Sequence, residues 1–134
     1  MFEVREYMFG ENKIIGRKNS ILDSKNRTSI PQFSGIEQGD KLVLIQENEE
    51  SFSIYEKKYY MEQIKILESK LEEIKDINIL IELKKYIEME YMKIVKELNC
   101  DKQHRVVLTE EVPKEITFFG CGDHLKMKRL EKNN

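Results

Sequence analysis

Two cysteine–histidine pairs in this chain have spacings that could bind a metal ion. Cys100 precedes His104 by four positions, and Cys121 precedes His124 by three. Thiolate and imidazole groups are ligands that Zn²⁺ prefers, and four of them complete a tetrahedral structural site. The alternative is that both thiols are buried and act as small apolar side chains. Because the spacing differs from that of common zinc fingers, we expect neither a metal nor another cofactor.

Catalytic patterns are harder to find in the sequence. Neither histidine is spaced to pair with a serine or cysteine nucleophile, and no glycine-rich segment has the pattern of a phosphate-binding loop. The carboxylates in the middle of the chain are distributed around expected helices, as they are on solvated surfaces. We therefore expect a protein that is not an enzyme.

Charge is unevenly distributed along the 134 residues, although the net charge is only −2. Residues 1–35 carry six Lys and Arg against four Asp and Glu, residues 36–97 carry ten against fifteen, and residues 98–134 carry seven against six. A near-neutral total can therefore include a basic face that could contact nucleic acid. No apolar run approaches the roughly 20 residues that span a bilayer, and the first residues do not form a secretory signal. These features predict a cytoplasmic protein with reduced thiols.

The chain alternates between strand-like and helix-like periodicity. After an N-terminal arm (1–15), short β segments extend to residue 56, and a hairpin turn is expected between Gln46 and Ser51. Apolar residues then recur every three or four positions, which predicts a helix over 56–75 and a second helix that Asp76 caps and that ends near 92–96. Their apolar rows are expected to form a core or an oligomer interface. Strand patterns return after residue 97, with Leu125 and Met127 on one face.

The second β segment repeats features of the first. Asp101 and Arg105 follow Asp23 and Arg27 by 78 positions, and each pair has the spacing Asp-x-x-x-Arg. Cys100 takes the place of Leu22, and both repeats continue with a strand, a short connector and a hairpin. A recurrence in the same β context indicates duplicated architecture. Each half alone has too few strands for an independent core, so we expect the halves to pair.

Several ordered motifs resemble the MraZ family, a relative of the AbrB-type regulators, over residues 16–134. Asp23-Ser24-Lys25-Asn26-Arg27-Thr28-Ser29-Ile30-Pro31 is similar to that family's Asp-x-x-Gly-Arg-x-x-Ile-Pro, and 101–108 is similar to its second copy. Gly120-Cys121-Gly122-Asp123-His124-Leu125 resembles its Gly-x-Gly-Asp-Arg-Ile. Asn26 and His104 replace the motif glycine, and we expect both to accept the positive φ that the turn requires.

The resemblance implies an α+β fold in which duplicated swapped-hairpin β units form a small pseudo-two-fold barrel with helices packed outside. The halves would comprise residues 16–75 and 76–134 of one compact domain. It also implies a nucleoid-associated transcriptional regulator that binds short repeats in promoter double-stranded DNA as a homo-oligomer, ring-like in form.

On that fold the turns would provide the DNA contacts, which we assign to Arg17, Lys18, Lys25, Arg27, Lys102, His104 and Arg105. Structural roles in the same turns are assigned to Asp23, Asn26 and Asp101. Each arginine could instead pair with its motif aspartate and only stabilise the turn. A rival hypothesis is an antitoxin-like protein-interaction module on the same scaffold. The overall acidity favours it, and so do the connectors that follow the two motifs, which are shorter here (Gln32-Phe33-Ser34-Gly35 in the first copy) than in the MraZ family.

Overall fold

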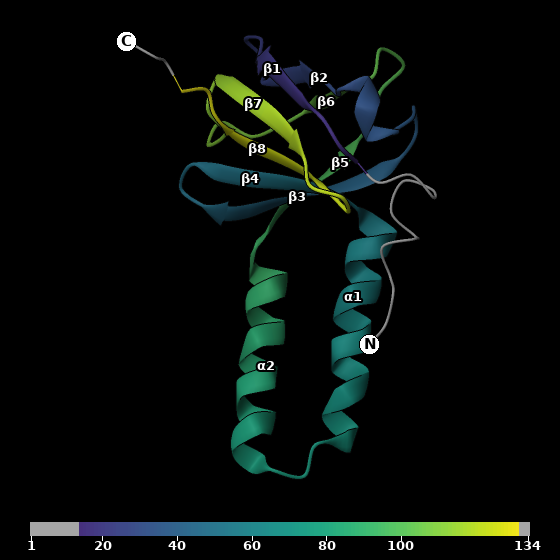
Figure 1. Ribbon diagram of the computed structural model, residues 1–134, viewed down its shortest axis with the longest axis vertical. Coiled ribbons are helices and arrows are strands. Elements are labelled where there is room, and N and C mark those ends of the chain that lie inside the picture. The colour runs from purple at the N-terminus through teal and green to yellow at the C-terminus, as the bar shows by residue number, and fades with distance from the viewer. Residues whose placement is uncertain (1–13, 132–134) are drawn as a thin grey trace.

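The computed structural model describes residues 14–131, which form a mixed α+β structure (Figure 1). Most of the expected N-terminal arm (1–13) lies outside the described residues. Ile14, at the end of that arm, is buried and forms an isolated β-bridge with Gly122. The elements in chain order are β1 (Arg17–Ile21), β2 (Arg27–Ser29), η2 (Gln32–Ser34), β3 (Lys41–Asn48), β4 (Ser51–Glu56), α1 (Lys57–Lys70), η3 (Leu71–Glu73), α2 (Ile77–Met92), β5 (Ile94–Asn99), β6 (Arg105–Val107), β7 (Glu115–Gly120) and β8 (Leu125–Arg129).

The strands form a six-stranded sheet with the order β1-β7-β8-β4-β3-β5 and a two-stranded sheet that pairs β2 with β6. All of these pairings are antiparallel. The predicted hairpin between Gln46 and Ser51 is confirmed as β3–β4. The first strand of each half pairs with the other half, since β1 lies beside β7 and β5 lies beside β3. The two halves therefore share one core.

Burial on both faces of β3 explains its continuous apolar run. Side chains on a strand point alternately to opposite faces. Leu42 and Leu44 enter the main core with Phe52 and Phe118, whereas Val43 and Ile45 pack beneath the helices. Leu125 and Met127 on β8 are also fully buried in the main core, as their alternation predicted.

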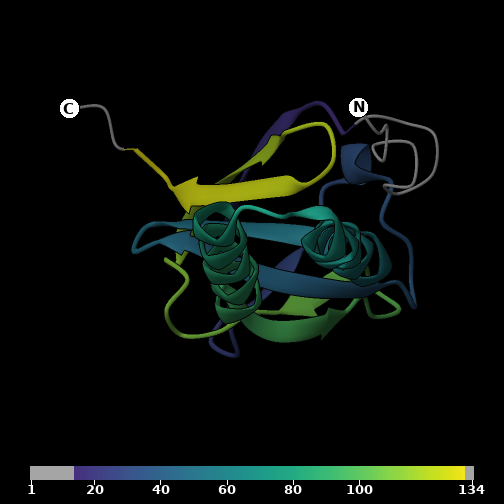
Figure 2. The same cartoon turned by 90° about the horizontal axis from the view of Figure 1, so that it is seen from below.

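The helices form a hairpin that projects from the sheet (Figure 1). Viewed from below, α1 and α2 lie side by side beneath the strands of the six-stranded sheet (Figure 2). Tyr60 and Ile64 of α1 and Ile87 of α2 pack against Val43 and Ile45, which anchors the base of the hairpin. None of the helices within residues 14–131 is long and apolar enough to cross a membrane.

The helix boundaries agree with the sequence pattern except at the end of α1. Asp76 caps α2 as predicted, because its Oδ1 accepts the N–H groups of Asn78 at 2.9 Å and Ile79 at 3.4 Å. The first helix was expected to continue to residue 75, but α1 ends at Lys70 and continues only as the 3₁₀ turn η3. Glu72 and Glu73 in η3 are exposed, so little packing favours extending the α-helix.

Candidate functional site

The two Asp-x-x-x-Arg segments fold into turns with the same hydrogen bonds. In the first turn, Asp23 Oδ1 accepts the backbone N–H groups of Lys25 and Arg27, each at 2.9 Å. In the second turn, Asp101 Oδ1 accepts those of Gln103 at 2.8 Å and Arg105 at 2.9 Å. The expected structural role of both aspartates as acceptors in the turns agrees with this geometry.

A left-handed residue closes each turn. Asn26 has φ 60° and His104 has φ 56°, and they are the non-glycine residues with positive φ in the described chain. Asparagine adopts this conformation more readily than most residues, whereas other L-residues are disfavoured there by their Cβ atom. The expectation that both residues would accept the conformation of the motif glycine is confirmed.

Both arginines form ion pairs with the aspartate of their own turn. Arg27 Nε lies 2.7 Å from Asp23 Oδ2, and Arg105 Nε lies 3.3 Å from Asp101 Oδ2. The pKa of Asp23 is lowered to about 2, mainly because the backbone N–H of Arg27 donates to its carboxylate. The pKa of Asp101 is lowered in the same way by the backbone N–H of Arg105. Each of the two ion pairs uses the Nε–H group of its arginine. The four Nη–H donors of each guanidinium take no part in the ion pair.

Pairing of β2 with β6 places the two turns side by side. Arg27 lies opposite Val107, and Ser29 lies opposite Arg105. Since side chains alternate across a strand, Arg27 and Arg105 share one face, and the intervening Thr28 points to the other face, where it is buried. Two equivalent backbone hydrogen bonds also join the turns. Leu108 N–H donates to Asn26 O at 2.8 Å, and Ile30 N–H donates to His104 O at 2.7 Å.

The remaining predicted DNA contacts surround these turns, with one partial exception. Lys25 and Lys102 are exposed on the first and second turn, respectively. Lys18 and His104 line a shallow hollow of about 560 Å³, which also includes Arg17. The guanidinium of Arg17, however, lies 5.5 Å from the ring centroid of Phe119 on β7. The Arg17 side chain therefore lies across β7. Because side chains alternate along a strand, it is on the opposite face of β1 from the Lys18 side chain.

Two lysines that the sequence reasoning missed lie at the first turn. Lys96 Nζ on β5 donates to Val107 O at 3.2 Å, and Lys114 Nζ contacts Asn26 Oδ1. Lys96 follows Lys18 by 78 positions, which is the separation of the two Asp-x-x-x-Arg motifs. Applying that separation to β1 could have identified Lys96 from the sequence. Lys114 has no comparable signal, because its approach to Asn26 depends on the pairing of distant segments.

The possible zinc ligands are not brought together. Cys100 is buried in the main core with Leu22, as the repeat predicted, whereas Cys121 is exposed, so the expectation of a buried thiol is wrong there. His124 Nδ1 contacts Asp123 Oδ1 at 2.7 Å, and its ring stacks on Tyr55. Within residues 14–131, no group of three or more His, Cys, Asp or Glu side chains is placed to hold a metal ion.

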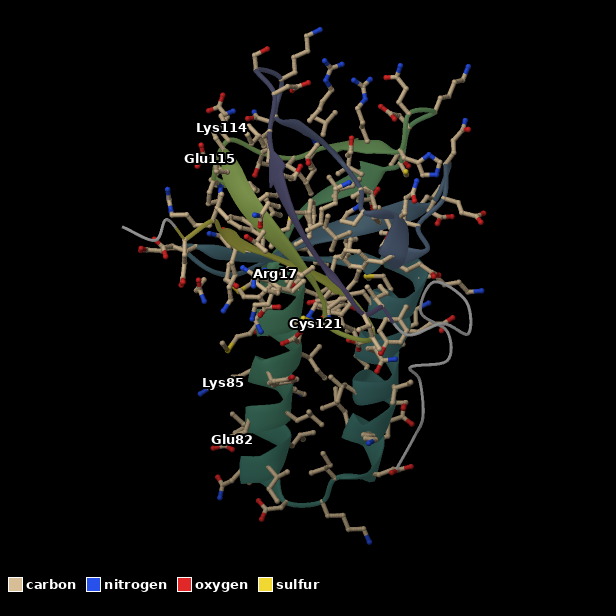
Figure 3. The ribbon with its side chains drawn as sticks, turned by 45° about the horizontal axis from the view of Figure 1, so that its top comes forward. Arg17, Glu82, Lys85, Lys114, Glu115 and Cys121 are labelled. Atoms are coloured by element: carbon tan, nitrogen blue, oxygen red, sulfur yellow. The ribbon has the colours of Figure 1, made fainter. Side chains whose placement is uncertain are left out.

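Cys121 is exposed because it lies in the turn between β7 and β8. Its N–H donates to His124 O at 2.9 Å, which closes the turn, and Figure 3 places it at the lower edge of the β region. The core positions on either side of this turn are supplied by Phe118 and Leu125 instead.

The paired turns therefore bring two arginines and several lysines together on one side of the described chain. A scan against models of known protein families returned no match, and a search of curated proteins found no relative.

Proposed function

We propose that this protein binds double-stranded DNA through the paired turns and regulates transcription. The observation that carries the proposal is the β2–β6 pairing, which holds Arg27 and Arg105 on one outer face. The two turns are built alike, so they can offer equivalent donors to two neighbouring positions along a duplex. Arginine is well suited to this role, because its planar Nη groups bind phosphate or guanine edges in pairs.

The charge around the turns supports contact with phosphates. Five lysines lie on or beside the turns, namely Lys18, Lys25, Lys96, Lys102 and Lys114. Asp23 and Asp101 are already paired with arginine, so they offset the arginine charge but leave the charge of the turn lysines Lys25 and Lys102 in place. A local excess of positive charge attracts a polyanion even in a chain whose net charge is −2. Most of these contacts would position the protein, and the arginines would be the candidates for base contacts.

The strand order supports duplicated swapped-hairpin units, the fold that the resemblance to the MraZ family implies. The order β1-β7-β8-β4-β3-β5 keeps its pattern when β1 is exchanged with β5, β3 with β7 and β4 with β8. The two-stranded sheet behaves in the same way, because β2 and β6 exchange places. In this proposal the chain contains a pseudo-two-fold axis between the two turns, and the DNA-binding face lies across it.

DNA binding of this kind gains affinity when several copies of the protein contact one duplex. The arginine charge at each turn is offset by an aspartate, so the phosphate contacts of a single copy would depend mainly on its lysines. An oligomer that contacts short repeats in one duplex multiplies those contacts through a high effective concentration. A protein bound in this way would be associated with the nucleoid.

A protein-interaction function on the same scaffold is the second candidate. The observation that favours it is the amount of exposed apolar surface on α2, which includes Ile77, Ile79 and Met92. Exposed apolar patches commonly mark protein interfaces. This surface lies on the helical hairpin, whereas β2 and β6 lie at the opposite end of the molecule (Figure 1), so the two functions predict different sensitive residues.

The test is DNA binding by a variant that lacks both turn arginines. Fluorescence anisotropy with a duplex from upstream of the protein's own gene would compare the wild type with Arg27→Ala plus Arg105→Ala. We expect at least about a tenfold loss of affinity, because removing two charge-assisted contacts costs well over 1.4 kcal/mol. The turns should persist, since the aspartate Oδ1 atoms still accept the backbone N–H groups.

A matched control removes the same positive charge from the helical hairpin. Lys65→Ala plus Lys75→Ala changes two exposed lysines of the helical hairpin, one on α1 and one between η3 and α2. We expect this variant to bind DNA with an affinity within about twofold of the wild type, because salt screens charges that lie far from the bound duplex. Equal losses in both double variants would contradict binding through the turns.

A further inference from the structure

Helix α2 is apolar over most of its circumference and yet is hardly buried. Ten of its sixteen residues are Ile, Leu, Met or Tyr, but Ile87 is the helix's one buried residue. A helix with apolar residues on all sides is normally enclosed by protein. The contacts that α1 and β5 make with α2 leave much of its apolar surface in solvent.

One exposed row runs the length of α2. It consists of Ile77, Ile81, Lys84, Glu88 and Met92, and we call it the α2 row. Spacings of three and four residues place all five side chains on one side of the helix. The exposed fractions of the three apolar members are 66% for Ile77, 46% for Ile81 and 81% for Met92.

The two charges of the α2 row are exposed and have opposite sign. Neither Lys84 nor Glu88 forms a salt bridge with any residue that the structure describes. When two α2 rows pack antiparallel about a two-fold axis near residue 86, Lys84 faces Glu88 of the second copy, and this pair occurs twice. A parallel arrangement would instead place Lys84 against Lys84. The charges of the α2 row are therefore complementary to those of a second copy's α2 row when the two helices pack antiparallel.

The same alignment also matches the apolar members. With residue 84 opposite residue 88, Ile81 lies near Tyr91 and Met92 of the second copy. The apolar side chains then flank the two charged pairs on both sides, as in antiparallel helix pairs of bundles. In this alignment residues 80–92 of one α2 face residues 92–80 of the other, which is a contact of about 20 Å at 1.5 Å per residue.

We infer that the α2 row binds a second copy of this chain, with the two α2 helices antiparallel and the helical hairpins forming a four-helix arrangement. The hairpin projects from the sheet, which leaves room for a second hairpin beside it (Figure 1). The paired turns lie at the opposite end of the molecule and stay uncovered. The inference stands without DNA binding, because it rests on the composition and exposure of α2 alone.

The experiment is sedimentation velocity over a micromolar concentration series, without DNA. The wild type should associate reversibly into dimers. Lys84→Glu and Glu88→Lys should each weaken the dimer at least about tenfold, because either substitution turns two attractive pairs into two repulsive pairs. An equimolar mixture of the two single variants should associate again, because both charges of one variant's row are then negative and both charges of the other variant's row are positive. The double variant carrying both substitutions should dimerise like the wild type.

Glu82→Lys is the matched control, because it makes the same charge change on the same helix. Figure 3 shows Glu82 pointing away from α1, on the outer side of α2. At about 100° per residue, Glu82 lies roughly 120° around the helix from the middle of the α2 row. This variant should dimerise like the wild type, and circular dichroism should show equal helicity for all variants. A wild type that stays monomeric throughout the series would overturn the inference. So would single variants that associate as strongly as the wild type, or a control that dissociates as the row variants do.

Discussion

Replacing His104 with glycine should stabilise the protein. His104 has φ 56° and is exposed, and no hydrogen bond of its imidazole is found among residues 14–131. A non-glycine residue in the left-handed region costs about 1–2 kcal/mol relative to its ordinary conformation. Glycine removes that cost but adds about 0.5–1 kcal/mol of conformational freedom to the unfolded chain. Taking the middle of each range, the difference predicts a net gain of about 0.5–1 kcal/mol in the free energy of unfolding.

Thermal unfolding followed by circular dichroism would measure this gain. For a chain of this size, 0.5–1 kcal/mol corresponds to a rise in Tm of roughly 2–4 °C. His104→Ala is the control, because alanine removes the imidazole but retains the Cβ atom that disfavours the left-handed region. It should leave Tm nearly unchanged. A glycine variant that melts below the wild type would refute the reasoning, and so would an alanine variant that gains as much as the glycine variant.

The equivalent change in the first turn should have a smaller effect. Asparagine adopts the left-handed region with less cost than histidine, so Asn26→Gly removes less strain. It also removes the contact between Asn26 Oδ1 and Lys114 Nζ. We therefore expect Asn26→Gly to leave Tm unchanged or slightly lower, which distinguishes the two turns in one set of measurements.

Three further predictions concern the core, the cap of α2 and the pH dependence of stability. Phe118→Ala should lower the free energy of unfolding by about 3–5 kcal/mol in urea titrations, because the side chain is fully buried; a change below about 1 kcal/mol would contradict its place in the core. Asp76→Ala should cost about 1 kcal/mol in the same assay, because it removes the acceptor of the Asn78 and Ile79 N–H groups; no change would place the start of α2 elsewhere. The folded-state pKa of Asp23 lies near 2, below its ordinary value of 3.8, so its contribution to stability is present above about pH 4 and is lost as the pH falls toward 2. Asp23→Asn should flatten that part of the stability curve in melts between about pH 2 and 5, and an unchanged slope would contradict the assignment.

Local patterns in the sequence predicted the individual elements better than their partners. The β3–β4 hairpin and the Asp76 cap depend on residues that are close in sequence, so alternation and capping rules were sufficient. The pairing of β2 with β6 joins two segments 78 positions apart, and each strand has only three residues. Such short strands carry too little pattern to specify a partner. The sequence therefore identified both turns but could not place them side by side.

The candidate site was likewise predicted in part. The turn arginines and their aspartates follow from the repeated motif, and the internal repeat also contains the information that would have identified Lys96. The packing of Arg17 on Phe119 could not be anticipated, because it depends on the register between β1 and β7. The exposure of Cys121 was missed for a related reason, since the residue lies in a turn whose neighbours supply the core.

The salt dependence of wild-type DNA binding tests the central claim most directly. Anisotropy titrations would use a duplex from upstream of the protein's own gene and a scrambled duplex of equal length, over a range of salt concentrations. We predict tighter binding to the native duplex, with log K falling linearly with log salt at a slope of several units, since each neutralised phosphate contributes about 0.9. Absence of binding to either duplex at low salt, from a folded protein, would contradict the account.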